Sequence, residues 1–452
     1  MNNASLTKDR EMINLEKNTF TNELSTQFLS FIETATSPFH VVKSIEEQLQ
    51  DNGFEALDFN QTWELSPGKA YYSIPYGTTL FAFRTPDEIS ENSAARIIAS
   101  HIDQPCFKIK PSADVKEHSY HKLNIEAYGG AILNTWLDRP LSIAGKVALR
   151  SDHIFSPEVK LIDVDQPLLT IPNLAIHMNK KVNSGVELNK QVDLLPIFSL
   201  CSEFEEEDFT FTNYLAEILK VSEEDILDYD LYVYSKEQGC ILGAKNELYS
   251  CPRIDNLSSV YAQLQALLRG ESSEKDFLIS IFYDNEEIGS KTKQGADSML
   301  APIFLKKLLY TFGYSDSDIC NFMMNSFLIS TDVAHATHPN HRERHDITNL
   351  TRINHGVAIK INGNQRYASD TEAIAVIQQI CETYAIPYQK YVNRSDIAGG
   401  STLGTILSSW LPIKTVDLGI PILAMHSIRE TAGTKDEISL MRLLHAFYSC
   451  EK

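Results

Sequence analysis

The sequence lacks the features of a disulfide-rich or membrane-spanning protein. Its seven cysteines are odd in number, scattered, and include no C-x-x-C pair. A disulfide framework would need paired cysteines at regular spacings, so we expect reduced thiols and a cytoplasmic location. No apolar run approaches the length of about 18 residues that a membrane span requires. The opening residues also lack the basic stretch and apolar run of a secretory signal, so we expect a protein that is not secreted.

Basic residues are also scarce. The chain has 40 Lys and Arg against 60 Asp and Glu, which gives a formal net charge of -20. A charge of this sign repels phosphate backbones and anionic membranes. We therefore expect neither a nucleic-acid partner nor a membrane partner. At 452 residues the chain is long enough for two or three domains, and it shows no internal repeat.

What the sequence does contain is a set of metal-binding residue types at the ends of apolar runs. Four such runs read as strands, and polar residues follow each of them. The carboxyl ends of strands line the ligand crevice in open α/β sheets, so these residues can converge in space. Two His, two Asp and a Glu-Glu pair are typical of a two-metal hydrolase, although any one of them alone is more often structural. The runs and residues are 95–100 before His101 and Asp103, 277–283 before Glu286 and Glu287, 327–331 before Asp332, and 420–425 before His426, with Asp255 opening a helix.

The order of helix-like and strand-like segments along the chain predicts an α/β domain that is interrupted by an insertion. Helix patterns cover 24–32, 38–52, 257–270 and 434–447, the last opened by a Thr434 to Glu437 capping box. From about 104 to 238 the pattern changes to short strand-like pieces at 107–110, 122–126, 142–149 and 159–162. We therefore predict a catalytic domain formed by residues 1–103 and 239–452, with an inserted β-rich domain at 104–238 between its two parts.

An ordered set of motifs resembles one known family over nearly the whole chain. The motifs are Thr36-Ser-Pro-Phe-His, Ser100-His-Ile-Asp-Gln-Pro-Cys, Thr135-Trp-Leu-Asp-Arg-Pro-Leu, Arg253-Ile-Asp-Asn-Leu, Glu286-Glu-Ile-Gly-Ser, Thr331-Asp-Val-Ala-His-Ala-Thr-His-Pro-Asn, Lys360-Ile-Asn-Gly-Asn-Gln-Arg-Tyr and Leu423-Ala-Met-His-Ser-Ile-Arg-Glu. Together they resemble the aspartyl aminopeptidase family of dinuclear zinc metallopeptidases. The resemblance implies an α/β fold: a zinc-peptidase-like, three-layer catalytic domain with a central mixed sheet, plus an inserted β-rich dimerisation domain.

The resemblance also implies roles for the candidate residues. His101 and Asp332 would hold one Zn²⁺, Glu287 and His426 the other, and Asp255 would bridge them, with Co²⁺ or Mn²⁺ as possible substitutes. Glu286 would be the general base, and Asp103 would orient His101. The expected reaction is removal of N-terminal residues, above all Asp and Glu, from peptides by a water molecule that bridges the metals.

Substrate and subunit contacts are implied in the same way. Lys360, His335 and Tyr367 would surround the side chain of the first substrate residue, although a lysine on its own is more often a snorkelling surface residue. His177 would reach into the active site of a neighbouring subunit, although a lone His is often structural. The expected assembly is a homo-oligomer, a dodecamer built from dimers.

Several alternatives stay open. The residues are compatible with a dinuclear zinc deacylase of N-acyl amino acids, and with a catalytically silent assembly protein of the same fold. Gly399 and Gly400 fit a backbone cradle for substrate or a plain turn. The histidines at 335, 338, 341 and 345 fit a loop that lines the pocket better than a metal site, because Pro339 interrupts a helical arrangement.

Overall fold

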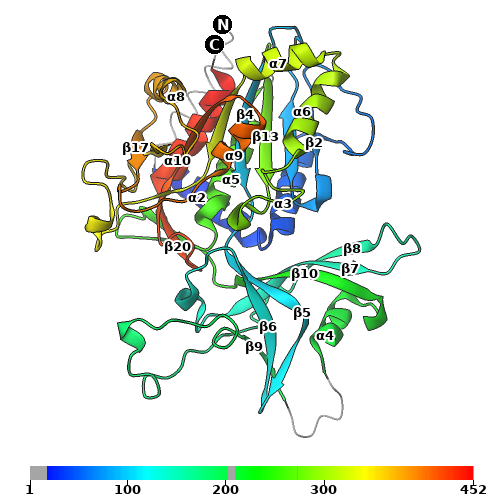
Figure 1. The fold of residues 1–452 in the computed structure, drawn as a ribbon, viewed down its shortest axis with the longest axis vertical. Coiled ribbons are helices and arrows are strands. Elements are labelled where there is room, and N and C mark those ends of the chain that lie inside the picture. The colour runs from blue at the N-terminus through cyan, green and yellow to red at the C-terminus, as the bar shows by residue number, and fades with distance from the viewer. Residues whose placement is uncertain (1–17, 202–208, 272, 451–452) are drawn as a thin grey trace.

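A central mixed sheet runs through the upper part of the molecule (Figure 1). The computed structural model describes residues 18–201, 209–271 and 273–450. Strands β13, β4, β14 and β18 pair in parallel in the middle of the sheet, so their carboxyl ends meet at one edge. Within the described residues the order of its nine strands is β1 (Glu55–Ala56), β2 (Ala70–Ser73), β3 (Leu80–Arg84), β13 (Phe277–Tyr283), β4 (Ala95–His101), β14 (Phe327–Thr331), β18 (Lys414–Gly419), β16 (Val357–Ile361) and β17 (Tyr388–Val392).

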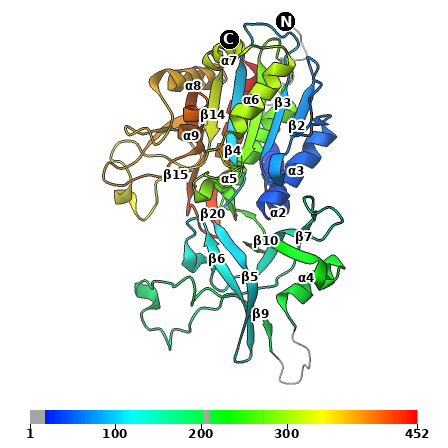
Figure 2. The same cartoon turned by 45° about the vertical axis from the view of Figure 1, so that its right-hand side comes forward.

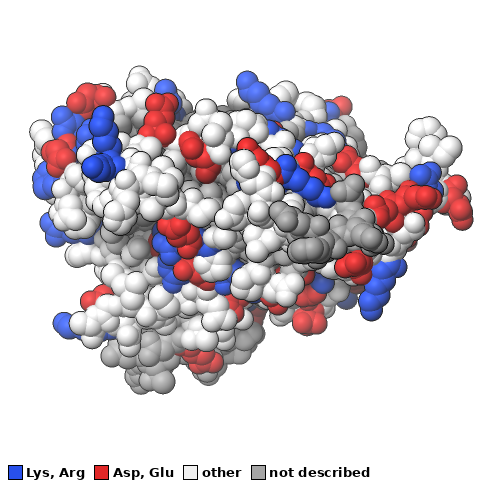
Figure 3. Space-filling model, turned by 90° about the horizontal axis from the view of Figure 1, so that it is seen from below, with Lys and Arg blue, Asp and Glu red and all other residues white. Residues whose placement is uncertain are grey.

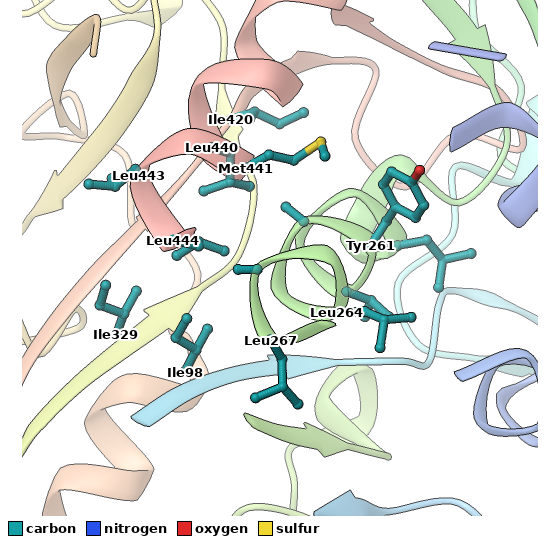
Figure 4. Packing of buried hydrophobic residues seen from close by; sticks show 14 of the residues in the cluster. Ile98, Tyr261, Leu264, Leu267, Ile329, Ile420, Leu440, Met441, Leu443 and Leu444 are labelled. Atoms are coloured by element: carbon teal, nitrogen blue, oxygen red, sulfur yellow. The ribbon is translucent and has the colours of Figure 1, made fainter. Parts of the chain in front are cut away.

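The sheet is covered by helices on both faces. Every residue of β4 and β13 is buried, and successive side chains enter different cores: Ile98 packs on one face, Ile97 and Ala99 on the other. Figure 4 shows Leu264 and Leu267 of one covering helix lying over the sheet. One layer holds α2 (Asn18–Thr34), α3 (Pro38–Asp51), α5 (Ile254–Arg269), α8 (Thr371–Thr383) and α10 (Thr434–Ser449), and the opposite layer holds α6 (Leu300–Thr311), α7 (Asp316–Asn325) and α9 (Leu403–Trp410). The expected three-layer α/β architecture with a central mixed sheet is confirmed.

A separate antiparallel sheet lies below the central one, as Figures 1 and 2 show from two directions. It has its own core, which includes Phe107, Ile143 and Leu231. Four of its strands fall on the four predicted pieces, and the sequence did not predict β9, β10 or the helix α4. The sheet order is β8 (Glu158–Asp163), β7 (Leu141–Leu149), β10 (Ile226–Ser235), β5 (Cys106–Glu117), β6 (Tyr120–Tyr128) and β9 (Ile197–Leu200), and α4 (Phe211–Leu219) packs against it.

The start of α3 joins the two sheets. Thr36 Oγ1 donates to Asp163 Oδ2 at 2.7 Å, and the Tyr234 hydroxyl donates to Asp163 Oδ1 at 2.6 Å. Phe39, in the first turn of α3, packs into the core of the antiparallel sheet, with its ring centroid 6.2 Å from that of Tyr232. The Thr36-Ser-Pro-Phe-His motif therefore links the central layers to the antiparallel sheet.

The predicted strand at 420–425 is shorter than expected and belongs to a different sheet. The run 420–425 forms only the three-residue β19, which belongs to a small third sheet and not to the central one. The chain leaves extended geometry directly afterwards, because Ala424 (φ 58°) and His426 (φ 66°) adopt left-handed conformations. The third sheet has the order β11 (Cys240–Leu242), β12 (Leu248–Cys251), β20 (Glu430–Gly433), β19 (Pro421–Leu423) and β15 (Ala334–His335).

The predicted capping box of the last helix is also wrong. Helix α10 begins at Thr434 with Gly433 as the N-cap residue, and no side chain caps it. Thr434 and Glu437 are both buried, so the glutamate faces the core instead of reaching back to the helix start. Tertiary burial has overridden a local sequence signal here.

Exposed apolar side chains gather on the antiparallel part of the chain. Phe155, at the tip of the β7–β8 hairpin, is 100% exposed, and Met178, between β8 and β9, is 69% exposed. From the side of this sheet, acidic and basic side chains lie interspersed with wide uncharged areas between them (Figure 3). None of the helices in the described part of the chain combines the length and apolar character that a membrane span requires.

Candidate metal centre

Five candidate metal ligands from five separate segments meet at the edge of the central sheet. His101 ends β4, Glu287 lies in the 3-10 turn Glu286–Ile288 after β13, and Asp332 directly follows β14. Asp255 lies in the first turn of α5, and His426 follows β19. Ligand atoms of His101, Asp255 and Glu287 all lie within 4.8 Å of one another. The parallel pairing of β13, β4 and β14 explains why three of the five converge.

Asp255 lies between the two histidines. Its Oδ1 is 3.4 Å from His101 Nε2, and its Oδ2 is 3.4 Å from His426 Nε2. The other carboxylates add one neighbour to each histidine: Asp332 Oδ1 is 3.6 Å from His101 Nε2, and Glu287 Oε2 is 3.5 Å from His426 Nε2. The cluster therefore has two halves that share one carboxylate.

The orientation of the histidine rings tests whether this cluster fits cations. His101 Nδ1 lies 3.0 Å from the Asp103 carbonyl oxygen, and His426 Nδ1 lies 3.1 Å from the Gly130 carbonyl oxygen. A carbonyl can only accept, so each Nδ1 carries a proton and a neutral ring presents a lone pair at Nε2. Both Nε2 atoms face carboxylate oxygens, and the buried Asp255 Oδ1 has no hydrogen-bond partner in the structure. Such an arrangement of acceptors fits a pair of divalent metal ions.

The pKa values of the clustered side chains are shifted because buried carboxylates and histidines lie close together. Burial lowers the pKa of His426, but the Asp255 carboxylate outweighs it and raises the value to about 9. Burial raises the pKa of Glu287 well above its ordinary value, and the charge of Asp255 adds to the rise. Burial opposes ionisation of Asp255 too, yet the two neighbouring histidines, His101 and His426, hold its pKa below the ordinary value. Bound cations would stabilise the ionised carboxylates and so offset the cost of burying them together.

Asp103 holds the two glutamates in place. Its Oδ1 accepts from the Glu286 N–H at 3.0 Å, and its Oδ2 accepts from the Glu287 N–H at 3.1 Å and from the Tyr128 hydroxyl at 2.8 Å. The side chain is fully buried. Asp103 also contacts His101 as expected, with Oδ1 3.5 Å from Nδ1. The Asp103 carboxylate thus positions Glu286 and Glu287 through their backbones, and it also contacts His101.

Glu430 is a functional residue that sequence reasoning missed. Its Oε2 accepts from the Asp255 N–H at 2.9 Å, and its Oε1 accepts from the His426 N–H at 2.8 Å. The side chain is 2% exposed, and burial raises its pKa to about 8, with the Asp255 carboxylate adding to the rise. Glu430 closes the last quoted motif, but its contact with Asp255 spans 175 positions and leaves no signal in the sequence.

Comparison with known proteins identifies the family. The model of the aminopeptidase I zinc metalloprotease family (M18) matches residues 31–448. The chain belongs to the M18 aminopeptidase family. It is 44% identical over 429 residues to a probable M18 family aminopeptidase 2 of Clostridium acetobutylicum, covering 94% of this chain and 99% of that one. This M18 protein is therefore a zinc-dependent aminopeptidase.

Solved structures share the fold of this M18 aminopeptidase. A chain in the cryo-EM structure of the Ape4 and Nbr1 complex superposes with a TM-score of 0.90 at 31% identity, covering 95% of this chain and 86% of that one. The S. cerevisiae mApe1 dodecamer superposes with a TM-score of 0.81 at 26% identity, covering 94% of this chain and 96% of that one. Both likenesses extend over the central and the antiparallel sheets.

The residues expected to bind substrate lie in different places in the M18 structure. Lys360 is buried beside the cluster, with Nζ 3.1 Å from Asp332 Oδ2 and 5.5 Å from the centroid of the Tyr367 ring. We expected a substrate carboxylate to supply the anionic partner of this ammonium, but Asp332 already supplies one. His335 lies at the end of β15 and is exposed. His177 lies in the exposed segment between β8 and β9, without a described hydrogen bond or ion pair to the cluster.

A cavity of about 500 Å³ has His335 in its wall, and the charges of Asp255 and His426 act on this residue; none of the five candidate ligands lines the cavity itself. His335 and Ala424 lie in its wall, and the loop with His338, His341 and His345 lines it, as the sequence predicts. Gly399 and Gly400 also line the cavity, so their backbone forms part of its wall.

Proposed function

We propose that this M18 aminopeptidase prefers peptides with Asp or Glu at the N-terminus. The observation that carries the proposal is the ammonium of Lys360, which is 2% exposed and lies at the edge of the metal cluster. An ammonium has three donors, and within the described residues the hydrogen bond to Asp332 uses one of them. A substrate carboxylate would satisfy the remaining donors in a place where water has little access.

The proposed metal ligands follow the two halves of the cluster. His101 and Asp332 would hold one Zn²⁺, Glu287 and His426 a second, and Asp255 would contact both through its two oxygens. Co²⁺ or Mn²⁺ would suit the same nitrogen and oxygen donors. When bound, the ions would supply Lewis acidity to the scissile carbonyl and lower the pKa of water.

Glu286 is the proposed general base. Burial raises the pKa of its carboxyl to about 7, with His101 opposing and Asp332 adding to the rise. A carboxylate with a pKa near the working pH can take a proton from water and pass it to the leaving amine. Its backbone N–H donates to Asp103, and this hydrogen bond holds the backbone of Glu286 in position.

The first substrate residue would lie against Lys360, Tyr367 and His335. The Tyr367 ring lies under the Lys360 ammonium, and its hydroxyl is 3.4 Å from Asn393 Oδ1. His335 is exposed in the cavity wall, so its ring is accessible for a hydrogen bond to the substrate. Of these three residues, Lys360 would be the one whose charge favours an acidic substrate side chain over a neutral one.

The proposed assembly is a cytoplasmic dodecamer built from dimers. Residues 104–238 would form the dimerisation domain, and His177 would complete the active site of a neighbouring subunit. The mApe1 relative is a dodecamer, and the segment around His177 carries exposed apolar side chains that suit burial in an interface.

Substitution of Lys360 tests the proposed specificity. We expect Lys360→Met to lower kcat/KM on aspartyl peptides by more than about tenfold relative to leucyl peptides, because a desolvated charge pair is lost. Metal content must be measured alongside, since Lys360 also contacts Asp332. Equal losses on both peptides would mean that Lys360 acts only through Asp332. An N-acyl-aspartate assay in parallel tests the deacylase alternative, which requires release of the acyl group.

A further inference from the structure

Apart from His335, the basic and imidazole side chains that line the cavity have no role in the proposed function. The lining residues include two arginines and four histidines and no Asp or Glu, although the chain has a net charge of -20. The charged and imidazole side chains are His335, His338, His341, His345, Arg344 and Arg394. A concave surface of one sign concentrates ligands of the opposite sign.

The two arginines differ in how far their charge is already compensated. Arg394 pairs with Asp396, with Nε 2.6 Å from Oδ1, and also donates to the Glu343 carbonyl. Arg344 is exposed, and its backbone N–H donates to the His341 carbonyl. Its guanidinium makes no hydrogen bond or ion pair within the described part of the chain, although the charges of Glu343 and Asp396 are near enough to interact with it. Its five guanidinium donors are therefore available to a ligand.

Backbone contacts make two of the histidines donors as well. The His338 N–H donates to His345 Nε2 at 2.9 Å, and the Asn340 N–H donates to His338 Nδ1 at 3.2 Å. A nitrogen that accepts a hydrogen bond carries no proton, so in a neutral ring the other nitrogen does. His345 Nδ1 and His338 Nε2 are thus N–H groups even when the rings are uncharged.

We propose that this outer basic wall, formed by Arg344, His338 and His345, binds a carboxylate located just beyond the scissile bond. Lys360 and Tyr367 are buried and do not line the cavity, so the first residue's side chain would point inward. The rest of the peptide must then leave through the open part of the cavity, past the exposed Arg344. This inference rests on the proposed function of the cluster as the place where the first peptide bond is cut.

Two substrates would present the same carboxylate. One is a peptide with Asp or Glu as its second residue, and the other is a dipeptide, whose α-carboxylate follows the scissile bond directly. Both would gain from the same donors, and neither gain depends on the identity of the first residue.

The test compares three substrates that share one first residue X: X-Ala amide, X-Ala with a free carboxylate, and X-Asp amide. We expect one or both carboxylate substrates to have a two- to fivefold higher kcat/KM than the neutral amide, through KM, as befits a largely exposed charge pair (about 0.4–1 kcal/mol). The gain should shrink at high ionic strength. Repeating the series with X as Asp and as Leu separates this wall from first-residue specificity, because a failed acidic preference changes all three substrates alike.

Arginine variants show whether Arg344 is responsible. Arg344→Ala should reduce the gain, whereas Arg342→Ala removes a neighbouring exposed arginine that does not line the cavity and should keep it. A gain on X-Ala alone identifies the dipeptide carboxylate, and a gain on X-Asp amide alone identifies the side chain. Equal kcat/KM for all three substrates, or the same gain in Arg344→Ala as in Arg342→Ala, would overturn the inference.

Discussion

Two adjacent glutamates beside the cluster have different surroundings. Glu287 Oε2 lies 3.5 Å from His426 Nε2, whereas Glu286 makes no ion pair with either histidine of the cluster. A carboxylate that faces the metal centre without contacting its histidines suits proton transfer, and one within it suits coordination. Their different positions are the basis for the two roles proposed for Glu286 and Glu287.

Replacement of Glu286 separates these roles. Glu286→Gln keeps the shape of the side chain and removes its ability to accept a proton, so we expect turnover to fall about 100- to 10,000-fold. Metal content should stay at the wild-type level, because no metal ligand changes. Steady-state rates and elemental analysis of the same sample check both expectations, and near-normal turnover would place the base elsewhere.

Glu430 offers a residue-level test of how the cluster is positioned. Its two oxygens hold the backbone N–H groups of Asp255 and His426, and the latter residue has a left-handed conformation. Glu430→Gln retains one acceptor oxygen, so one of these contacts is lost. We expect metal affinity to fall about 10- to 100-fold, as for other residues that orient metal ligands. Competition with a chelator measures this affinity without reference to activity.

A matched variant controls for the buried amide. Glu437 is also buried and lies on α10, and its two carboxylate oxygens have no hydrogen-bond partner among the described residues. Glu437→Gln introduces the same amide without touching the metal ligands, so its metal affinity should equal that of the wild type. If both variants lose metal equally, the effect of Glu430 is a general consequence of destabilisation.

At the scale of elements, the sequence predicts those strands whose whole length is buried. Runs 277–283, 95–101 and 327–331 are rich in apolar residues and almost completely buried because helices cover both faces, and their parallel pairing brings His101, Glu287 and Asp332 together. The approach to His426 was not predictable, because β19 is only three residues long and joins another sheet. Contacts such as Glu430 to Asp255 depend on tertiary packing and leave no periodic pattern.

The junction between the two sheets can be tested at Phe39. Its ring packs in the antiparallel core, with Lys146 Nζ 4.5 Å from the ring centroid, although the residue belongs to α3. We expect Phe39→Ala to lower the free energy of unfolding by about 3–5 kcal/mol, the usual cost of removing a buried phenylalanine. Denaturant unfolding measures the change. Lys43→Ala, on the exposed side of the same helix, serves as the control and should stay within about 0.5 kcal/mol of wild type.

At the scale of the whole molecule, the antiparallel part leaves apolar surface uncovered. Ile176 and Met178 flank His177 in the sequence, and both are exposed. Monomeric proteins seldom expose several large apolar side chains in one short segment without an interaction partner. The dodecameric mApe1 relative makes a second copy of the chain the proposed partner of this segment.

Mixed oligomers test whether His177 acts between subunits. His177→Phe subunits keep Glu286 but would lack the histidine that they offer to a neighbour, and Glu286→Gln subunits keep His177 but would lack the base. In a hybrid, the intact Glu286 of the first subunit can receive His177 from the second, so one complete active site forms. We expect hybrids purified through two different tags to be more active than either parent oligomer. Each parent carrying both tags is the control, and hybrids that never exceed the sum of the parents would show that His177 does not act in a neighbouring site.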